Sequence, residues 1–544
     1  MPRGNNESLE DHVLLKRRDL LRAGATVPAL AAAESLTGVD ARKNKNKSKK
    51  KDKGGGRDYS GMNVLLFITD QQRAIMHFPD GWAEQNLPGA TRLKQNGLSF
   101  NKAFCSSCMC SPSRATLLTG YFPAQHGVKY TLEENMPADQ YPQVELPLDL
   151  PNLGTVMQAA GYAVPYKGKW HLSKKTEADW VPNDVNRYGF ERWDPPDAGA
   201  NQAVDQFGGG DPNNDGRFVN DNGDVASGHE GVIDYLTSAA AQQQPFFLTV
   251  SLVNPHDVLA YPTTYDDPGS GYDDSDLVGT IDLPPTIVED LSSKPTAQSQ
   301  ALAIMNVGLG PLPTTQMQRN YLNFYGNLMK ESDAYLVQIL DTLEAQGLLE
   351  NTLIIQTSDH GEMGLCHNGM RQKVFNFYEE TLNVELVYSN PRLFPQPEST
   401  NAMVSHVDFT PTMASLFNAP QSARAKWQGK DYSGVLRKPK KNKGPQKYVV
   451  FTFDDFQAGQ PTGPYVQPPN HLTTIREGRY KLAKYYDVAG VVPEQWEMYD
   501  LKHDPLETVN IAAPSHKKNK RQREEYNRLV KKLSQVEKER LQPL

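Results

Sequence analysis

Three stretches of the chain are continuously apolar over the length of a β-strand, and each is followed by acidic residues or histidine. They span residues 63–69, 246–253 and 352–357. An apolar run without alternation is typical of a parallel strand that is covered on both faces. Segments with helical spacing lie between these runs, the longest at residues 315–346. Strands that alternate with helices predict an α/β fold with a large, mostly parallel sheet sandwiched by helices.

The pattern changes beyond residue 435. Short strand-like segments such as residues 448–453 follow a basic link, and a charged helical segment at residues 515–541 closes the chain. Consecutive strands that end in a helix predict an antiparallel sheet with one helix packed on it. We therefore expect a main α/β domain at residues 60–435 and a smaller C-terminal domain at residues 436–544.

The N-terminal region has the composition of a targeting segment followed by a tether. A Lys-Arg-Arg triplet at residues 16–18 precedes an alanine-rich stretch at residues 23–33. This arrangement resembles a twin-arginine export signal over residues 1–40. Residues 41–59 are rich in lysine and glycine, and because such a run cannot pack a core, we expect a disordered linker. The expected location is periplasmic or secreted.

The charge distribution argues against a nucleic-acid partner. The net charge is -7, although residues 41–57 alone hold nine Lys or Arg and one Asp. The rest of the chain is therefore strongly acidic and should repel phosphate backbones. Mean hydropathy is -0.60, and the sequence has no run of about eighteen apolar residues, so no stable membrane span is expected.

The cysteines are too few for a disulfide scaffold. They are Cys105, Cys108, Cys110 and Cys366. The Cys-x-x-Cys pair at Cys105 and Cys108 has no second pair or histidine pair at zinc spacing, which argues against a zinc cluster there. The sequence leaves a disulfide between Cys105 and Cys108 open.

Residues 110–120 predict a short helix whose first turn suits an anion. The stretch begins Cys-Ser-Pro-Ser-Arg and ends Leu-Thr-Gly, and proline near the start with glycine at the end is typical of a helix. Cys110 would lie at the helix N-terminus, where the peptide dipoles favour negative charge. Arg114 lies one turn later on the same side and offers a fork of donors for a sulfate or phosphate. The alternative interpretation is a buried cysteine before a core helix.

These residues resemble the signature of the type I sulfatases of the alkaline phosphatase superfamily, in which the cysteine is oxidised to formylglycine. Other motifs of that family follow in order: Gly-Lys-Trp-His at residues 168–171, Pro-His at 255–256 and Ser-Asp-His-Gly at 358–361. The resemblance covers residues 60–512 and implies a sulfuric ester hydrolase with a divalent metal. It also implies a sulfated small molecule or glycan as substrate, and a formylglycine-generating enzyme as the partner in maturation.

By this resemblance, Asp70, Asp359 and the oxidised Cys110 hold one divalent ion, together with the neighbouring Gln71 and His360. Asp70 and Asp359 each follow an apolar strand, which is where open α/β sheets bind their ligands. Gln71 stands where many family members have aspartate, and His360 where many have asparagine. Calcium is the expected ion, and the smaller number of carboxylates leaves magnesium or manganese open.

The resemblance also implies roles at the sulfate group. Lys169 and Lys373 bind its oxygens, with Arg114 beside the nucleophile. His171 hydrogen-bonds the formylglycine hydroxyl and later takes its proton, while His256 protonates the leaving alcohol. The hydrated aldehyde attacks sulfur, and its second hydroxyl lets the aldehyde reform and expel sulfate. Further residues nearby are expected to have supporting roles at most: Glu362, His367, and either Glu379 or Glu380.

Three other functions stay open on the sequence. A phosphonate monoester or phosphodiester hydrolase has the same scaffold, but it usually carries Gly and Ala where this chain has Ser-Pro-Ser. A non-catalytic sulfoglycan-binding protein would not need His256 as an acid, and an alkaline phosphatase relative that uses Cys110 or Ser111 directly would need further metal ligands. The specificity of any of these would depend on residues 196–228 and 257–313, which we expect to be long loops that shape the pocket.

Overall fold

The computed structural model describes residues 56–74, 77–134, 143–199, 211–220, 229–265, 271–457, 459 and 465–544. Gly56–Leu544 form one compact unit. The export signal expected at residues 1–40 lies outside the described residues, as does the expected linker up to residue 55. The last linker residues pack on the fold, since Arg57 pairs with Glu398 at 2.6 Å and the buried Tyr59 donates its hydroxyl to Leu436 O. No helix among the described residues combines the length and apolar character needed to cross a membrane.

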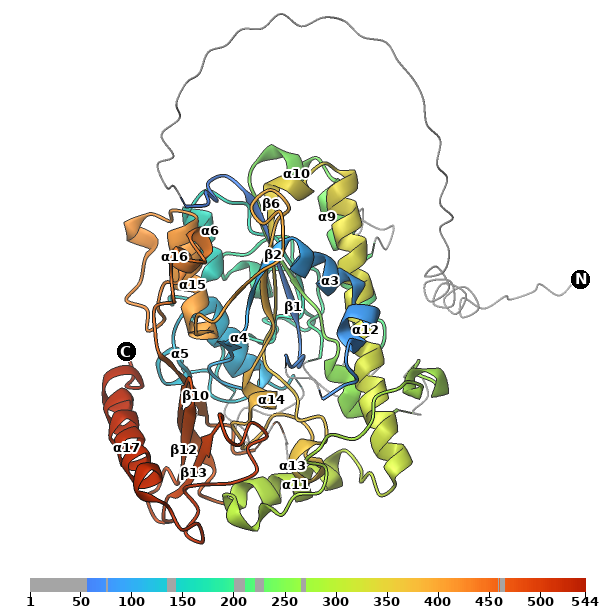
Figure 1. Cartoon of the computed structure of the whole chain (residues 1–544). Coiled ribbons are helices and arrows are strands. Elements are labelled where there is room, and N and C mark those ends of the chain that lie inside the picture. Colours follow the sequence, from blue (N-terminus) through green and yellow to red (C-terminus); the bar gives the residue numbers. More distant parts are fainter. Residues whose placement is uncertain are drawn as a thin grey trace, which may run out of the picture. The chain divides into compact units, whose positions relative to one another are not determined.

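A seven-stranded sheet forms the centre, in the order β4-β5-β1-β6-β7-β2-β8 (Figure 1). Strands β4, β5, β1 and β6 are mutually parallel, and β7 runs antiparallel to both of its neighbours. The predicted large, mostly parallel sheet is therefore confirmed. Its strands are β1 (Asn63–Thr69), β2 (Gly97–Phe100), β4 (Tyr166–Gly168), β5 (Phe247–Ser251), β6 (Thr352–Ser358), β7 (Leu386–Ser389) and β8 (Glu398–Thr400).

Helices cover both faces of this sheet, as the unbroken apolar runs predict. Along β1, Val64 and Leu66 pack in one core cluster with Leu117, whereas Leu65 and Phe67 pack in another with residues of the longest helix. Burial of each such side chain contributes ~2 kcal/mol. One helix layer holds α3 (Pro88–Gln95), α9 (Val232–Thr237) and α12 (Thr315–Ala345), and the other holds α4 (Cys110–Thr119), α6 (Leu153–Ala159), α15 (Phe409–Leu416) and α16 (Ser433–Arg437) (Figure 1).

The register of the parallel strands brings their carboxyl ends to one edge of the sheet. Thr69 of β1 pairs with Ser358 of β6, so the residues that follow these strands are direct neighbours. Ser251 of β5 pairs with Ile68 on one side and with Gly168 of β4 on the other. Strand β4 runs from Tyr166 to Gly168, so Lys169 follows the strand directly.

A four-stranded antiparallel sheet and a helix make up the C-terminal part. The strands β10 (Tyr448–Phe453), β11 (His471–Glu477), β12 (Tyr480–Tyr486) and β13 (Gln495–Asp500) are consecutive neighbours. Helix α17 (Lys520–Arg540) packs Leu529 and Leu533 against Ile475 and Leu482 of this sheet. It starts five residues later than expected because Asn519 caps it, accepting from the backbone N of Gln522. The predicted antiparallel sheet with one helix is confirmed.

The two segments expected to be long loops contain helices. Helix α8 (Asn214–Val219) lies in the first, and α11 (Thr296–Gly308) in the second. The composition of α11 explains the difference, because its alanine, glutamine, leucine and methionine are good helix formers that the neighbouring Pro, Gly and Asp residues obscure. The shorter described elements are α2 (Trp82–Asn86), β3 (Ala103–Phe104), α5 (Pro123–His126), α7 (Asn183–Asn186), α10 (Ala240–Gln243), η3 (His256–Ala260), η4 (Asp274–Leu277), η5 (Leu291–Ser293), η6 (Leu349–Asn351), α13 (Cys366–Gly369), α14 (Glu379–Leu382), β9 (Val404–Ser405), η7 (His406–Asp408) and η8 (Gln421–Ala423).

His126 at the end of α5 hydrogen-bonds Thr116 of α4 and makes a pH-dependent contribution to the unfolding free energy. Its Nδ1 accepts from Val128 N at 3.2 Å, so Nε2 carries the proton that hydrogen-bonds Thr116 Oγ1 at 3.0 Å. Burial lowers the pKa of His126 to about 3, whereas an unfolded histidine titrates near pH ~6.5. The unfolded state alone gains this proton as the pH falls, so the contribution is present above pH ~6.5 and is lost below it.

We therefore expect His126→Gln to reduce the pH dependence of the unfolding free energy. Between pH 7.5 and pH 5 the wild type should lose ~2 kcal/mol more than the variant, as 1.5 pH units at 1.36 kcal/mol each imply. Urea unfolding of both proteins at the two pH values measures this difference. Parallel pH profiles for wild type and variant would contradict the assignment.

Candidate active site

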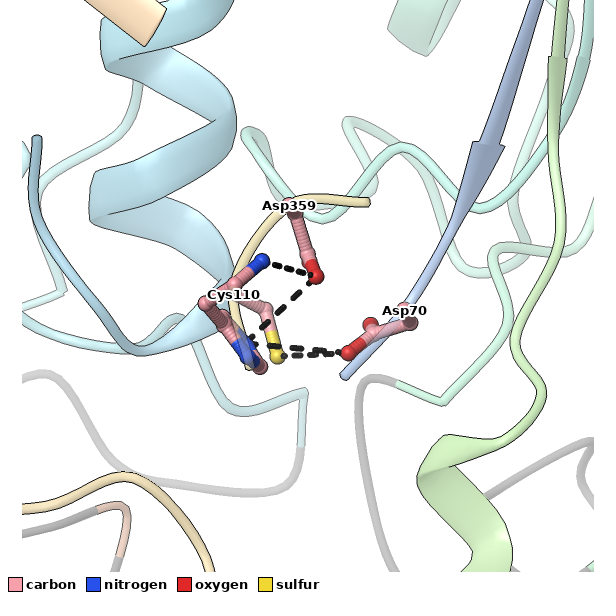
Figure 2. Close-up of side chains that lie close together, drawn as sticks. Asp70, Cys110 and Asp359 are labelled. Atoms are coloured by element: carbon pink, nitrogen blue, oxygen red, sulfur yellow. Dashed lines mark hydrogen bonds and ion pairs between the residues drawn. The ribbon is translucent and has the colours of Figure 1, made fainter. Parts of the chain in front are cut away.

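Cys110 begins helix α4 and lies at the sheet edge where β1 and β6 end (Figure 2). Its buried thiol lies 3.7 Å from Asp70 Oδ1, and the predicted helix is confirmed from Cys110 to a left-handed Gly120. Both serines of the first turn fix its position. Ser111 Oγ accepts from Leu132 N at 3.0 Å, and Ser113 Oγ donates to the backbone oxygen of Asp359.

Asp70, Cys110, Asp359 and His360 form a buried group of metal-ligand side chains, with one ligand atom of each within 4.8 Å of all the others. His360 Nε2 lies 3.7 Å from Asp70 Oδ1 and 3.6 Å from Asp359 Oδ1. Its Nδ1 hydrogen-bonds Gly361 O at 3.1 Å, which leaves the lone pair on Nε2, and this buried atom has no hydrogen-bond partner. An unpartnered imidazole nitrogen that faces two carboxylates fits a divalent cation.

Gln71 contacts this group mainly through its backbone. Its N–H donates to Asp359 Oδ1 at 3.0 Å, in a left-handed conformation with φ 67°. Its side chain lies between two other residues, with Nε2 2.5 Å from Glu362 Oε2 and Oε1 2.6 Å from Lys373 Nζ. The Gln71 carboxamide thus contacts Lys373 and Glu362, and it links Lys373 to the carboxylates of the site.

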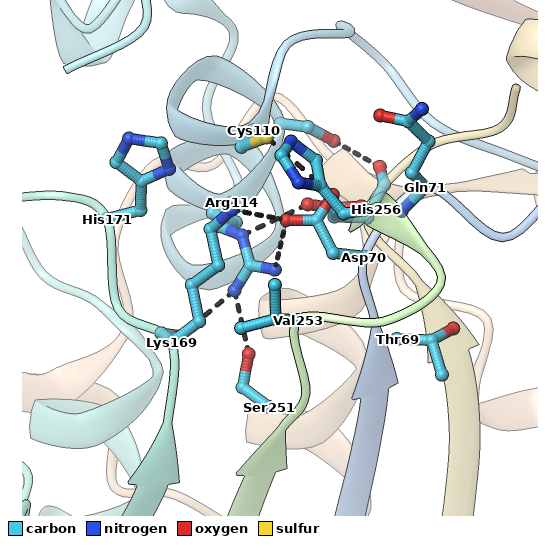
Figure 3. Close-up of polar contacts among 12 residues, drawn as sticks. Thr69, Asp70, Gln71, Cys110, Arg114, Lys169, His171, Ser251, Val253 and His256 are labelled. Carbon is cyan, nitrogen blue, oxygen red and sulfur yellow. Dashed lines mark hydrogen bonds and ion pairs between the residues drawn. The ribbon is translucent and has the colours of Figure 1, made fainter. Parts of the chain in front are cut away.

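Arg114 and Lys169 both contact Asp70 (Figure 3), and Arg114 also contacts Asp359. Lys169 Nζ lies 2.7 Å from Asp70 Oδ2, and Arg114 bridges Asp70 and Asp359 at 3.2 and 3.0 Å. The remaining Arg114 donor reaches Ser251 Oγ at 2.7 Å and Lys169 O at 3.0 Å. The Arg114 fork, expected to bind the anion, is therefore engaged by protein acceptors. Burial opposes ionisation of Asp70, but the Lys169 and Arg114 charges hold the pKa of its carboxyl well below its usual value.

His171 and His256 are both buried and neutral near pH 7. Burial and the neighbouring Lys169 lower the pKa of His171 to about 3, and the same causes lower the pKa of His256 well below its usual value. His171 Nε2 donates to Leu132 O, and its Nδ1 has no hydrogen-bond partner. The backbone N–H groups of His171 and Trp170 donate to Asp197, which fixes the strained segment after β4, where His171 has φ 59°.

A pocket of about 240 Å³ opens beside these residues. Cys110, His171, His256 and Lys373 all line it, so the structure brings together residues from four distant segments. The segments expected to shape the pocket do contribute, since its wall also includes Gly199, Leu259, Thr263, Thr264, Met305, Gly308 and Leu309.

Sequence reasoning missed three residues of this site. Ser251 could have been found, because it is a polar residue within the apolar run at residues 246–253, and it ends strand β5, the neighbour of β1. Asp197 and Glu133 lie in polar segments without a motif, so no local signal singles them out. Glu133 lines the pocket, and burial raises the pKa of its carboxyl to about 8. Its carboxyl therefore keeps a proton to higher pH than an ordinary glutamate, and in the protonated form it can donate a hydrogen bond.

The other three cysteines are free and buried, so Cys105 and Cys108 form no disulfide in this structure. Cys105 Sγ lies 3.5 Å from Thr381 O, and Cys108 Sγ lies 3.1 Å from Lys373 O. Both thiols thus point to separate backbone oxygens instead of to each other.

Comparison with known proteins identifies relatives that match residues 62–539. Residues 62–419 match the family model Sulfatase, and residues 367–539 match N-sulphoglucosamine sulphohydrolase, C-terminal. An ulvan-active sulfatase of Formosa agariphila is 24% identical over 74% of this chain and 70% of its own length. A Delta 4,5-hexuronate-2-O-sulfatase of Bacteroides thetaiotaomicron is 24% identical over 76% of this chain and 77% of its own. The solved structure of a 2-O GAG sulfatase has a TM-score of 0.64 at 21% identity, covering 88% of this chain and 93% of that one.

These matches agree with the fold and with the place of the site. The Sulfatase model covers well over half of the chain and includes Asp70, Cys110, Lys169 and Asp359. The structural likeness extends over both the large mixed sheet and the antiparallel C-terminal sheet. The chain therefore belongs to the sulfatase family of the alkaline phosphatase superfamily and is a sulfuric ester hydrolase.

Proposed function

We propose that this sulfatase hydrolyses a sulfate ester on a carbohydrate or another organic alcohol, with formylglycine made from Cys110 as its nucleophile. The observation that carries the proposal is the position of Cys110, which starts helix α4, lies 3.7 Å from Asp70 Oδ1 and lines the pocket with His171 and His256. The two relatives described above are named for ulvan and for a hexuronate 2-O-sulfate. Their names favour a sulfated glycan as the substrate class.

The cations and histidines of the site have complementary roles in the proposal. Lys169 and Lys373 supply positive charge for the sulfate oxygens, and Arg114 keeps both carboxylates in place. His171 accepts a proton from the nucleophile at its unpartnered Nδ1. A bound sulfate brings negative charge next to His256 and raises its pKa, so His256 can take up a proton and deliver it to the leaving oxygen.

The donor set fits a single divalent ion. Asp70, Asp359 and His360 would hold it together with the oxidised Cys110, and calcium, magnesium and manganese all accept such oxygen-rich ligands. When bound, the ion neutralises negative charge on the nucleophile and on the sulfate. The lone pair of His360 Nε2 faces the Oδ1 atoms of both aspartates, as a shared cation requires.

The alternative on this scaffold is a phosphonate monoester hydrolase or phosphodiesterase. The Ser-Pro-Ser segment after Cys110 favours the sulfatase, because both serines fix the helix start by contacts that glycine and alanine cannot make. We also propose that the chain is exported to the periplasm or secreted through its twin-arginine segment. It would first be matured by a formylglycine-generating enzyme.

Mass and turnover together test the proposal. Trypsin should release residues 103–114, and this peptide should carry formylglycine when the protein is made in a host that can form it. Turnover of an aryl sulfate should exceed that of the matched aryl phosphonate monoester by at least about 100-fold. An unmodified thiol with no activity on any sulfate ester would sink the proposal, and a preference for the phosphonate would support the alternative.

A further inference from the structure

A second group of metal-ligand side chains lies outside the active-site pocket. His77, Cys366 and Glu380 bring an imidazole nitrogen, a sulfur and a carboxylate oxygen within 4.8 Å of one another. His367 lies beside these three residues but is not one of the group within 4.8 Å, and its Nε2 lies 3.9 Å from Glu380 Oε2. The four residues come from the segment after β1, the turn α13 and helix α14. None of them lines the pocket that contains Cys110.

His367 is oriented as a metal ligand would be. Its Nδ1 lies 2.6 Å from Glu289 Oε2, and Lys294 holds that carboxylate at 3.0 Å. Because Nδ1–H donates to Glu289, the lone pair lies on Nε2, and this atom is fully buried without a hydrogen-bond partner. The ring stacks on Tyr378 with centroids 3.6 Å apart, which fixes its plane. Metal-bound histidines commonly donate their other N–H to a carboxylate in this way.

The backbone of this turn is strained toward the same point. Leu365, His367 and Asn368 have φ values of 62°, 52° and 67°, in the left-handed region that non-glycine residues avoid. Such strain persists only where the surroundings enforce it, and it is concentrated at binding sites. Here it lets Cys366 and His367, which are adjacent in sequence, both face Glu380.

We infer that His77, Cys366, His367 and Glu380 form a zinc site. Two imidazoles, one thiolate and one carboxylate are the donors that zinc prefers in a tetrahedral site. Zinc binding would release the thiol proton to solvent, so the two charges of the ion would be balanced by the Cys366 thiolate and the Glu380 carboxylate. Arg73 Nη1, 3.7 Å from Cys366 Sγ, would support that thiolate. His77 is the partly exposed member, with 16% of its side chain accessible, and gives the ion a path of entry.

Hydrogen bonds within the cluster give partners to only some of its ligand atoms. His77 Nε2 lies 2.8 Å from Glu380 Oε1, which pairs these two residues. This contact leaves His367 Nε2 without a hydrogen bond, at a distance from Glu380 that is too long for one. A cation between the side chains would give that nitrogen a partner.

The site would connect the segments that carry the catalytic carboxylates. His77 follows Asp70 in the segment after β1, and Cys366 follows Asp359 in the segment after β6. Glu362 N donates to Glu380 O at 3.1 Å, so α14 is already paired with the second segment. We expect zinc to act as a structural link here, with no contact to the substrate.

Zinc content and affinity test the inference on the full chain. The metal-stripped protein should take up one Zn²⁺ that survives Asp359→Asn, because that variant removes only an active-site ligand. Cys366→Ser and His77→Gln should each lower zinc affinity by at least about 100-fold in competition with a chromophoric chelator. Cys105→Ser, a buried cysteine outside both groups, is the matched control and should bind zinc as the wild type does. Unchanged affinity in both Cys366→Ser and His77→Gln would overturn the assignment.

Cobalt gives a second readout, and its deciding measurement is made on a protein that keeps Cys366. In a Cys110→Ala background, which removes the thiol of the active site, added Co²⁺ should give a near-ultraviolet thiolate charge-transfer band. The band should be absent when Cys366→Ser is added to that background. A cobalt complex of the Cys110→Ala protein that lacks the band would exclude Cys366 as a ligand. Activity is not part of either measurement, so failure here leaves the proposed sulfatase function unaffected.

Discussion

Replacing Cys110 with alanine should lower kcat for aryl sulfate hydrolysis by at least about 10⁴-fold, the scale at which loss of a covalent nucleophile is felt. Neither neighbouring cysteine can take its place, because Cys105 and Cys108 are buried against the backbone oxygens of Thr381 and Lys373. The unfolding midpoint should change little, since alanine has the same helix-forming backbone and the thiol makes one weak contact, to Asp70. Stopped and continuous assays with an aryl sulfate measure the loss.

Two variants make this result specific. Cys105→Ala removes a neighbouring buried thiol and should keep kcat within about two-fold of wild type, since the lost contact is remote from the reacting atoms. Cys110→Ser should accept one sulfo group and then stop, because a serine adduct has no second hydroxyl to expel sulfate. Intact mass spectrometry should show that adduct. Residual turnover of Cys110→Ala above one part in about 10² would contradict a nucleophilic role for Cys110.

Asp70→Asn should have the next largest effect, with kcat/KM lowered by ~10³-fold. The substitution keeps the shape of the side chain but removes the negative charge that Lys169 and Arg114 contact at 2.7 and 3.2 Å. It also removes one ligand from the group with Asp359 and His360, so affinity for a divalent ion should fall by at least ~100-fold. Calorimetric titration with Ca²⁺, Mg²⁺ and Mn²⁺ compares the two proteins and identifies the ion that wild type prefers.

Chelation separates the effect on metal binding from a general loss of structure. Removing divalent ions from wild type should lower activity to about the level of Asp70→Asn, and the chelator should have no further effect on the variant. Asp333→Asn is the matched control. Asp333 belongs to α12, and its buried carboxylate accepts from Gly89 N and Ala90 N at 2.7 Å. It therefore lies at the start of α3 and not at the sheet edge. Its activity should equal that of wild type, and full activity of chelated wild type would exclude a catalytic ion.

Some elements are determined by local sequence because their causes are local. The unbroken apolar run at residues 63–69 predicts a strand covered on both faces, and β1 occupies those residues. The proline and glycine around Cys110 predict a helix that starts there, and α4 does. Composition misled where helix formers stand among turn residues, as in α11, because a loop-like average hides a helical segment.

For the candidate site, too, the sequence predicts some features and the structure alone shows others. Its motif residues can be read from the chain, and the structure places Cys110, His171, His256 and Lys373 around one pocket. The contacts that each of these side chains makes could not be predicted from the sequence. Arg114 has the charge to bind an anion, yet its donors are engaged by Asp70, Asp359 and Ser251. The acceptors that Arg114 meets lie in segments 44 to 245 residues away in the chain.

By itself the sequence determined the fold class, the family motifs and the helix that presents Cys110, since periodicity, helix punctuation and motif order all act over short distances. Only the tertiary structure decided which side chains meet. The strand register aligns Thr69 with Ser358 and so places Asp70 beside Asp359. In the same way, the packing of α14 on the segment after β6 brings Glu380 to Cys366 and His367, residues whose spacing in the chain matches no metal motif. Contacts of this kind arise from the pairing of distant segments, and no local pattern records them.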